Sequence, residues 1–342
     1  MIDHAKYFQL NNKSVAQLKS LRGPIAVFGA GGFIGVNLLH FLLQHRDDVF
    51  GISHDKFNNW RFSASGTPHA SILSCDINDF TQLKLLFENF KPQTIFNLAA
   101  YGAYSKQKEY KKIYFTNFDS SIDIIELLKG QGFSAYIHAG SSSEYGLNSA
   151  GPKETDPLIP NSHYAVSKTA MSYAIKYYGL IEKLPVANLR LYSAYGPWEE
   201  PDRLMPMLIS SARNKKFPPL VEPKISRDFI YISDICSAFI ASASAVSSIK
   251  GMSLNIGSGN KTTISEIVSQ VKEKCGVPGE PVFGSMDNRN WDKTEWYANI
   301  DFSTKQLEWR PEVELQEGIE KIIQWQNEMD FDNAFWNYTR QL

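Results

Sequence analysis

The nine residues VFGAGGFIG, positions 27–35, decide the fold. They stand between an apolar run that ends at Phe28 and the amphipathic stretch VNLLHFLLQH, positions 36–45. Gly29 permits a tight turn after a strand, Gly32 lets the backbone approach a pyrophosphate, and Gly35 lets a helix pack closely on that strand. The N-terminus of the helix then faces the anion. The stretch therefore predicts a dinucleotide site, whose expected cofactor-binding residues are Gly29, Gly32, Phe33, Ile34 and Gly35.

Residues 24–130 repeat this alternation of short apolar runs and amphipathic stretches. Runs such as TIFNLAA (94–100) and AYIHAG (135–140) are apolar at successive positions, which is typical of strands covered on both faces of a parallel sheet. We expect an α/β fold with a doubly wound, Rossmann-like parallel sheet. After about residue 188 the regularity weakens and Pro and Trp become frequent, which indicates a smaller, loop-rich mixed α/β domain.

Three parts are therefore expected along the chain. Residues 1–23 form an N-terminal extension, which is either a short amphipathic helix or a disordered arm. Residues 24–188 form the dinucleotide-binding domain, and residues 189–342 are mainly the substrate domain.

Composition limits the classes of partner. The 35 Lys and Arg nearly cancel the 36 Asp and Glu, so we expect neither a nucleic acid nor a membrane surface as partner. The three cysteines are widely spaced and show no metal-ligand pairing, so we expect no metal site and a reducing, cytoplasmic location. The first twenty residues contain no apolar stretch of the kind that a signal peptide needs.

The end of the second expected strand, DVFGISHD (48–55), bears on the choice between NAD and NADP. An acidic residue about 20 positions after the glycines would accept hydrogen bonds from the ribose 2'-hydroxyl. Counting from Gly35 without a gap places Ser53 there, and Asp55 follows two residues later. Three basic residues lie near the end of this strand: His54, Lys56 and Arg61. They either bind the 2'-phosphate of NADP or are loop charges exposed to solvent. The cofactor is therefore NAD or NADP, with a lean to NADP from Ser53.

The stretch SHYAVSK (162–168) places Tyr164 and Lys168 four residues apart, on one face of a helix. A phenol is a poor base at its reference pKa of about 10. An ammonium one turn away, together with an oxidised nicotinamide, favours the phenolate and permits proton exchange with a hydroxyl of the substrate. We therefore expect the pair to be catalytic.

The motifs GAGGFIG, CDI (75–77), NLAA (97–100), SSSEYG (141–146) and YAVSK are followed by LRLYSAYGP, RDFIYISD and NRNWD. In this order they resemble the extended short-chain dehydrogenase/reductase family, in the branch that modifies nucleotide-diphosphate sugars. The likeness runs from about residue 24 to 325. It implies that Tyr164 is the acid/base, Lys168 its electrostatic partner and ribose anchor, and Ser141 a hydrogen-bond partner of the reacting sugar oxygen.

The same resemblance implies further contacts. The expected contacts to the cofactor are made by Ser53, Asp76, Ile77, Leu98, Ala99, Ala100 and Asn117. Those to the substrate fall to Ser142, Ser143, Ser193, Arg227, Arg289 and Asp292, where the arginines suit phosphate oxygens. Relatives usually carry asparagine where this chain has Ser193, so this contact departs from the pattern.

The serine string decides between reactions. In the dehydratase branch an acid and a base precede Tyr-Gly at two places that Ser142 and Ser143 hold here, and Glu144 comes one residue later. A slip of one residue in extended backbone turns a side chain to the opposite face, so we expect Glu144 to be a loop carboxylate near the rim of the site.

We therefore expect an NAD(P)-dependent 4-epimerase of a nucleotide-diphosphate sugar, active as a homodimer. An NADPH-dependent 4-keto-sugar reductase is the main alternative. A 4,6-dehydratase and a non-catalytic dinucleotide sensor are further alternatives.

Overall fold

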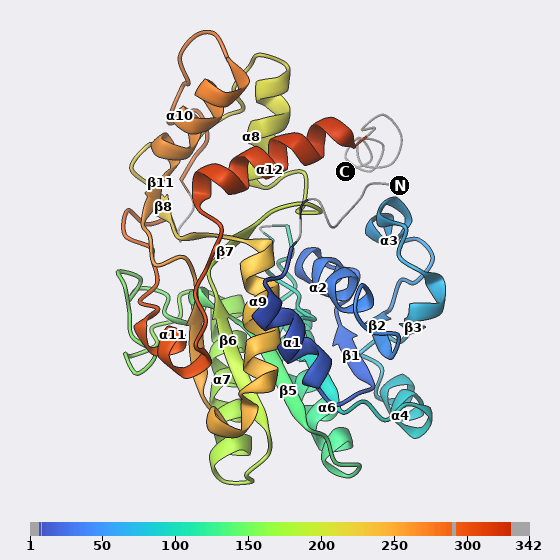
Figure 1. Cartoon of the computed structure of the whole chain (residues 1–342). Coiled ribbons are helices and arrows are strands. Elements are labelled where there is room, and N and C mark those ends of the chain that lie inside the picture. Colours follow the sequence, from blue (N-terminus) through green and yellow to red (C-terminus); the bar gives the residue numbers. More distant parts are fainter. Residues whose placement is uncertain (1–6, 8, 105, 289–291, 330–342) are drawn as a thin grey trace.

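A seven-stranded parallel sheet forms the centre of the chain in the computed structural model, which describes residues 7, 9–104, 106–288 and 292–329 (Figure 1). The strand order is β10-β6-β5-β4-β1-β2-β3. The order reverses beside β1, so that the carboxyl ends of β1 and β4 flank the place where a doubly wound sheet binds its ligand. The bounds are β1 Ile25–Phe28, β2 Val49–Ser53, β3 Ile72–Ser74, β4 Thr94–Asn97, β5 Ala135–Ser141, β6 Val186–Leu191 and β10 Ser253–Ile256.

Helices cover both faces of this sheet, as the apolar strands predict (Figure 1). Along β1, Ile25 and Val27 enter one core while Ala26 and Phe28 enter the other. The first core is closed by α1 (Asn12–Ser20), α2 (Phe33–Leu43) and α9 (Ile232–Ser244). The second is closed by α4 (Phe80–Asn89), α6 (Ser120–Lys129) and α7 (His163–Leu180). The expected Rossmann-like fold is confirmed.

A second group of elements lies beyond the carboxyl ends of the strands (Figure 1). Two small sheets belong to it, β7 with β9 and β8 with β11. The strands are β7 Ser193–Tyr195, β8 Ser226–Arg227, β9 Phe229–Tyr231 and β11 Thr262–Thr263, and the helices are α8 Leu204–Arg213, α10 Ile264–Cys275 and α12 Leu315–Glu328. Helix α11 (Asp301–Leu307) lies beside the main sheet, against β10 and α9.

The path of the chain between the two groups is interleaved. Strand β6 spans the expected boundary at residue 188, and the chain returns from β9 through α9 to add β10 beside β6. The N-terminal extension contains helix α1, which Asn11 caps by accepting from the N–H of Ser14 and which packs against α9. The division into domains at 23 and 188 stays a prediction.

The remaining elements are short. They are α3 (Trp60–Ser65), α5 (Tyr110–Tyr114), the π-helical turn η3 (Phe115–Asp119) and the 3-10 turns η2 (His69–Ser71), η4 (Ser142–Glu144) and η5 (Val246–Ser248). Within the described ranges, no helix combines the length and the apolar character that a membrane crossing requires.

Candidate active site

The glycine loop between β1 and α2 leaves space for an anion. Gly29 has φ of 72°, and a Cβ there would lie 2.7 Å from the backbone nitrogen of Ala99. A Cβ on Gly35 would lie 2.1 Å from the Gly29 carbonyl oxygen, so the close packing of helix on strand requires glycine. At Gly32 a Cβ would meet that same oxygen at 3.2 Å and, outside its own helix and chain neighbours, no other atom within 4 Å, so this side of the loop is open. The first turn of α2 carries no acidic residue, and the loop therefore fits a dinucleotide pyrophosphate.

Other expected cofactor residues line the neighbouring strand ends. Asp76 and Ile77 follow β3, and Leu98 leads from β4 into a turn in which its N–H donates to the Phe28 carbonyl. The amide of Asn117 is occupied by the protein itself: it accepts from the N–H of Tyr101 and donates to the Tyr101 carbonyl and to Ser167 Oγ. In the described structure Asn117 thus ties the turn after β4 to helix α7.

At the end of β2 the structure corrects one expectation. Ser53 is the last residue of the strand, as counted, and its Oγ accepts from the N–H of Asp55 at 3.3 Å. Arg61 was expected to be a donor to a 2'-phosphate or a solvated charge, but it is 4% exposed. Its Nε donates to the Trp198 carbonyl at 2.8 Å, and its Nη2 lies 2.8 Å from the Glu200 carboxylate. The guanidinium is therefore buried and already paired within the protein. Its partners Trp198 and Glu200 lie 137 and 139 residues away in sequence.

Tyr164, Lys168 and Ser141 meet at the carboxyl end of β5. Ser162 caps α7 by accepting from the N–H of Ala165, so both Tyr164 and Lys168 lie in the first two turns. Lys168 is buried, its Nζ donates to the Ala139 carbonyl at 2.8 Å, and it stands 5.9 Å from the centre of the Tyr164 ring. Ser141 is the last residue of β5, and its side chain is close enough to Tyr164 to lower the pKa of the phenol. The four-residue spacing thus places phenol and ammonium side by side, as predicted.

The protonation of this pair is set mainly by burial. Burial raises the pKa of Tyr164 to about 12, against the opposing effects of the Ser141 hydrogen bond and of the Arg203 cation. Burial also lowers the pKa of Lys168 to about 8, which the negative charge of Glu144 partly opposes. The phenol therefore stays protonated at neutral pH in the protein alone, and a further positive charge is needed to make it a base.

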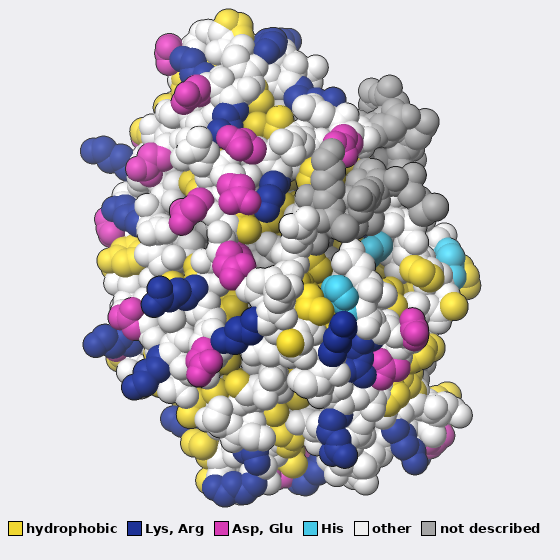
Figure 2. Space-filling model, in the orientation of Figure 1, with side chains coloured by type: hydrophobic (Ala, Val, Ile, Leu, Met, Phe, Trp, Pro, Cys, Tyr) yellow, Lys and Arg dark blue, Asp and Glu magenta, His cyan; other side chains and the backbone are white. Residues whose placement is uncertain are grey.

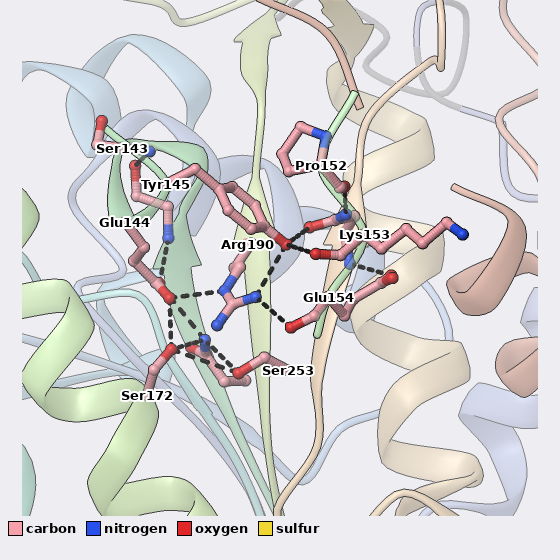
Figure 3. Close-up of polar contacts among 12 residues, drawn as sticks. Ser143, Glu144, Tyr145, Pro152, Lys153, Glu154, Ser172, Arg190 and Ser253 are labelled. Atoms are coloured by element: carbon pink, nitrogen blue, oxygen red, sulfur yellow. Dashed lines mark hydrogen bonds and ion pairs between the residues drawn. The ribbon is translucent and has the colours of Figure 1, made fainter. Parts of the chain in front are cut away.

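The serine turn η4 contains a second correction. Glu144 was expected near the rim, but it is fully buried beneath the turn (Figure 3). Its Oε1 accepts from the N–H of Ser141 at 3.0 Å, and its Oε2 accepts from Arg190 Nε at 2.7 Å and from Ser172 Oγ. The backbone leaves the extended conformation after Ser141 and turns in a 3-10 helix, which directs Glu144 inward. Arg190 is 46 residues away in sequence, which is why the motif alone gave no sign of this ion pair.

The other two serines of the turn bond to different partners. Ser142 Oγ accepts from the indole nitrogen of Trp296 at 3.2 Å, while Ser143 uses its N–H to bond Ser141 Oγ. Arg227 lies over the Trp296 ring at 5.0 Å and forms an ion pair with Asp292 at 2.5 Å. Trp296 was not singled out from the sequence, although its place four residues after NRNWD is a signal in retrospect.

Two expected substrate residues are left to place. Ser193 begins β7, where its N–H donates to the Asp228 carbonyl. Arg289 lies outside the described residues. Among the residues that the structure describes, no three of the types His, Cys, Asp and Glu converge in a way that could hold a metal ion.

One charged pair near Tyr164 was also missed. Glu199 is 6% exposed and its Oε1 lies 3.7 Å from Nε of Arg203, whose guanidinium stands over the Tyr104 ring at 5.6 Å. Burial raises the pKa of Glu199 to about 8. This cluster joins the turn after β4 to the loop before α8.

Comparison with known proteins adds the family. The model of the NAD dependent epimerase/dehydratase family matches residues 25–257. The UDP-glucuronate 4-epimerase of Thermodesulfobacterium geofontis is 26% identical over 320 residues, 90% of this chain and 97% of that protein. The structure of UDP-glucuronic acid 4-epimerase from Bacillus cereus with UDP-glucuronic acid and NAD matches with a TM-score of 0.77 at 25% identity, over 89% of this chain and 99% of that one. The dTDP-glucose 4,6-dehydratase of Bacillus anthracis with NAD matches with a TM-score of 0.75 at 26% identity, over 92% and 98%. Similar folds thus accompany epimerisation and dehydration, and the site has to discriminate between them.

Proposed function

We propose that this chain, which belongs to the NAD dependent epimerase/dehydratase family, is a 4-epimerase of nucleotide-diphosphate sugars. The observation that carries the proposal is the meeting of Ser141, Tyr164 and Lys168 at the end of β5, in the same sheet edge as the open glycine loop. A dinucleotide sensor does not need a buried phenol beside an ammonium, so the pairing of Tyr164 with Lys168 favours a catalytic role. The named 4-epimerases among the relatives support the same reaction.

The residues would act on the C4 hydroxyl of the sugar. The glycine loop and Lys168 would hold the nicotinamide cofactor, which would supply reversible hydride transfer at C4 of the sugar. Tyr164 takes the hydroxyl proton and later gives it back, and Lys168 stabilises the phenolate by its positive charge. Ser141 orients the reacting oxygen through a neutral hydrogen bond. Burial raises the pKa of Tyr164, and an oxidised cofactor would supply a positive charge that lowers it.

The burial of Glu144 argues against a 4,6-dehydratase. Elimination of water needs a base at C5, and the two residues at the expected acid and base places are Ser142 and Ser143. Both carboxylate oxygens of Glu144 accept hydrogen bonds from the protein beneath the turn, which leaves this group without a free position from which to reach a sugar.

The cofactor is NAD or NADP, and we propose NAD. Structures of relatives contain NAD. Arg61, one of three cations considered for a 2'-phosphate, is held by Glu200. Titration of both cofactors by protein fluorescence tests this: NAD should bind more tightly than NADP, and Ser53→Asp should widen the difference through like-charge contact with the 2'-phosphate. Tighter binding of NADP by the wild type would contradict the proposal.

Incubation of the purified protein with UDP- and dTDP-hexoses and their uronic acids tests the reaction. We expect one pair of C4 epimers to approach equilibrium from either side without net consumption of cofactor. Consumption of one NADPH per turnover would indicate the reductase instead. Loss of the C6 oxygen with solvent deuterium at C5 would indicate the dehydratase.

We also propose that the active form is a homodimer in a reducing compartment. Helices α5 and α7 pack together and carry an exposed apolar surface, which a second copy would cover. This surface contains Tyr110, Val166, Tyr173, Tyr177 and Leu180, each at least 40% exposed. Cys75, Cys236 and Cys275 are all free thiols, which supports the compartment.

The surface of Figure 2 mixes cations and anions and shows no large area of one sign, which gives no support to a polyanionic partner on that face.

A further inference from the structure

We propose that Glu144 is a positioning residue: it fixes Ser141 through the backbone of the serine turn and supplies the negative charge that faces Tyr164 and Lys168. This inference rests on the proposed function, because it assigns the catalytic pair to Tyr164 and Lys168. It goes beyond that function because Glu144 touches neither cofactor nor sugar.

The first argument is the turn itself. Glu144 and Ser141 form a reciprocal capping box, in which the carboxylate accepts from the N–H of Ser141 while Ser141 Oγ accepts from the N–H of Ser143. Both contacts fix Ser141, the residue whose side chain lowers the pKa of Tyr164. A Cβ on Gly140 would lie 2.5 Å from the same Glu144 oxygen, so the chain places glycine where the carboxylate needs room.

The second argument is the set of elements that converge on this carboxylate (Figure 3). Ser172 donates to it from α7, one turn after Lys168 on the same face of the helix. Arg190 donates to it from β6 and carries the balancing charge. Glu144 therefore connects the serine turn, the helix of the catalytic pair and the sheet at one buried point.

The third argument is electrostatic. Tyr164 is faced by Glu144 from η4 and by Arg203 from the start of α8. Lys168 is faced by Glu144 and by His138 of β5, an imidazole whose pKa is lowered well below its ordinary value by burial and by the Lys168 charge. The negative charge of Glu144 raises the pKa of both members of the pair. Its removal must therefore move both ionisations to lower pH.

Glu144→Gln is the test, because it removes the charge and keeps the shape. We expect the pH profile of kcat to move to lower pH by on the order of one pH unit, the usual spread of pKa values in proteins. We also expect kcat to fall at least about tenfold while KM for the sugar nucleotide changes little, because the amide nitrogen of Gln cannot accept from both Arg190 and Ser172, and the loosened turn no longer fixes Ser141 relative to the reacting oxygen. A profile that stays in place would overturn the electrostatic role, and an unchanged kcat would overturn the positioning role.

Glu154→Gln is the matched control. Glu154 is a second carboxylate of the same cluster: its carbonyl accepts from Arg190 Nη1 and its side chain accepts from the N–H of Asn255. It is not among the groups that shift the pKa of Tyr164 or Lys168. The control should therefore keep the wild-type pH profile. An equal shift in both variants would mean that any loosening of the cluster moves the profile, which would overturn a specific role of Glu144.

A second readout needs no sugar and separates this inference from the proposed function. Lys168 is the expected ribose anchor, so cofactor affinity should fall as its ammonium loses a proton near pH 8, and Glu144→Gln should move this fall to lower pH. If the wild type shows this transition but epimerises no sugar, the proposed function fails while the role of Glu144 stands. If Glu144→Gln does not fold, Glu144→Gln/Arg190→Met removes both charges of the pair and should show a smaller displacement in the same direction, since Glu144 is the member of the pair that shifts the pKa of Tyr164 and Lys168. If the pH at which cofactor affinity falls is the same in the wild type and in the variant that folds, the inference is refuted.

Discussion

Replacement of Arg61 by Met tests whether this cation stabilises the fold or binds the 2'-phosphate of NADP. The side chain is 4% exposed and joins three places: its Nε donates to Trp198, its Nη1 donates to the Gly31 carbonyl at 3.3 Å, and its Nη2 pairs with Glu200. Removal of one partner from a buried ion pair costs about 3–5 kcal/mol, since the other charge is left without compensation. With roughly 2.1 cal/mol/K of unfolding entropy per residue over 342 residues, this loss lowers Tm by about 4–7 °C.

The glycine loop loses a donor in the same variant, so NAD and NADP should both bind more weakly and by similar factors. Differential scanning calorimetry gives Tm, and fluorescence titration gives the two Kd values. Lys56→Met is the control, because Lys56 lies over the exposed ring of Phe57 and should leave Tm within about 1 °C. A variant that keeps its Tm and loses affinity for NADP alone would refute the structural role and restore Arg61 as the 2'-phosphate donor.

Three further predictions concern the pair and the expected dimer. Tyr164→Phe should lower kcat by at least ~10²-fold with cofactor affinity nearly intact, and near-wild-type turnover would remove the phenol from the mechanism. The wild-type rate should fall as pH rises through about 8, where Lys168 loses its proton; Lys168→Met should be much slower and lack this alkaline limb, and a persisting limb would assign it to another group. Tyr173→Arg should shift sedimentation from dimer to monomer, because it places a charge in the proposed contact; an unchanged dimer would locate the interface elsewhere.

The fold could be predicted because its signals are local. A few neighbouring residues are enough to predict the turn and the strands. The turn follows from the glycines at 29, 32 and 35 and the sheet covered on both faces follows from the apolar runs, and the structure has both. The pairing of Tyr164 with Lys168 was equally predictable, since four residues on a helix fix a common face.

The parts that failed depend on partners far away in sequence. Glu144 is buried because Arg190 on β6 neutralises it, and Arg61 is buried because Glu200 arrives from the loop before α8. The local sequence around a charged residue predicts that it is exposed to solvent. Its buried partner is brought close only when the chain folds. The expected place of Glu144 at the rim of the site was also wrong, because a 3-10 turn begins where the prediction assumed extended backbone.

The return of the chain to the main sheet has a consequence for engineering. Strand β10 lies beside β6, so β7, α8, β8 and β9 are inserted between two neighbouring strands of the sheet, while β11, α10 and α12 follow β10. Deletion of everything after β6 would strip an edge strand and helix α9 from the sheet and expose their apolar contacts. Exchange of substrate preference with a relative therefore requires two grafts, one between β6 and α9 and one after β10, made together.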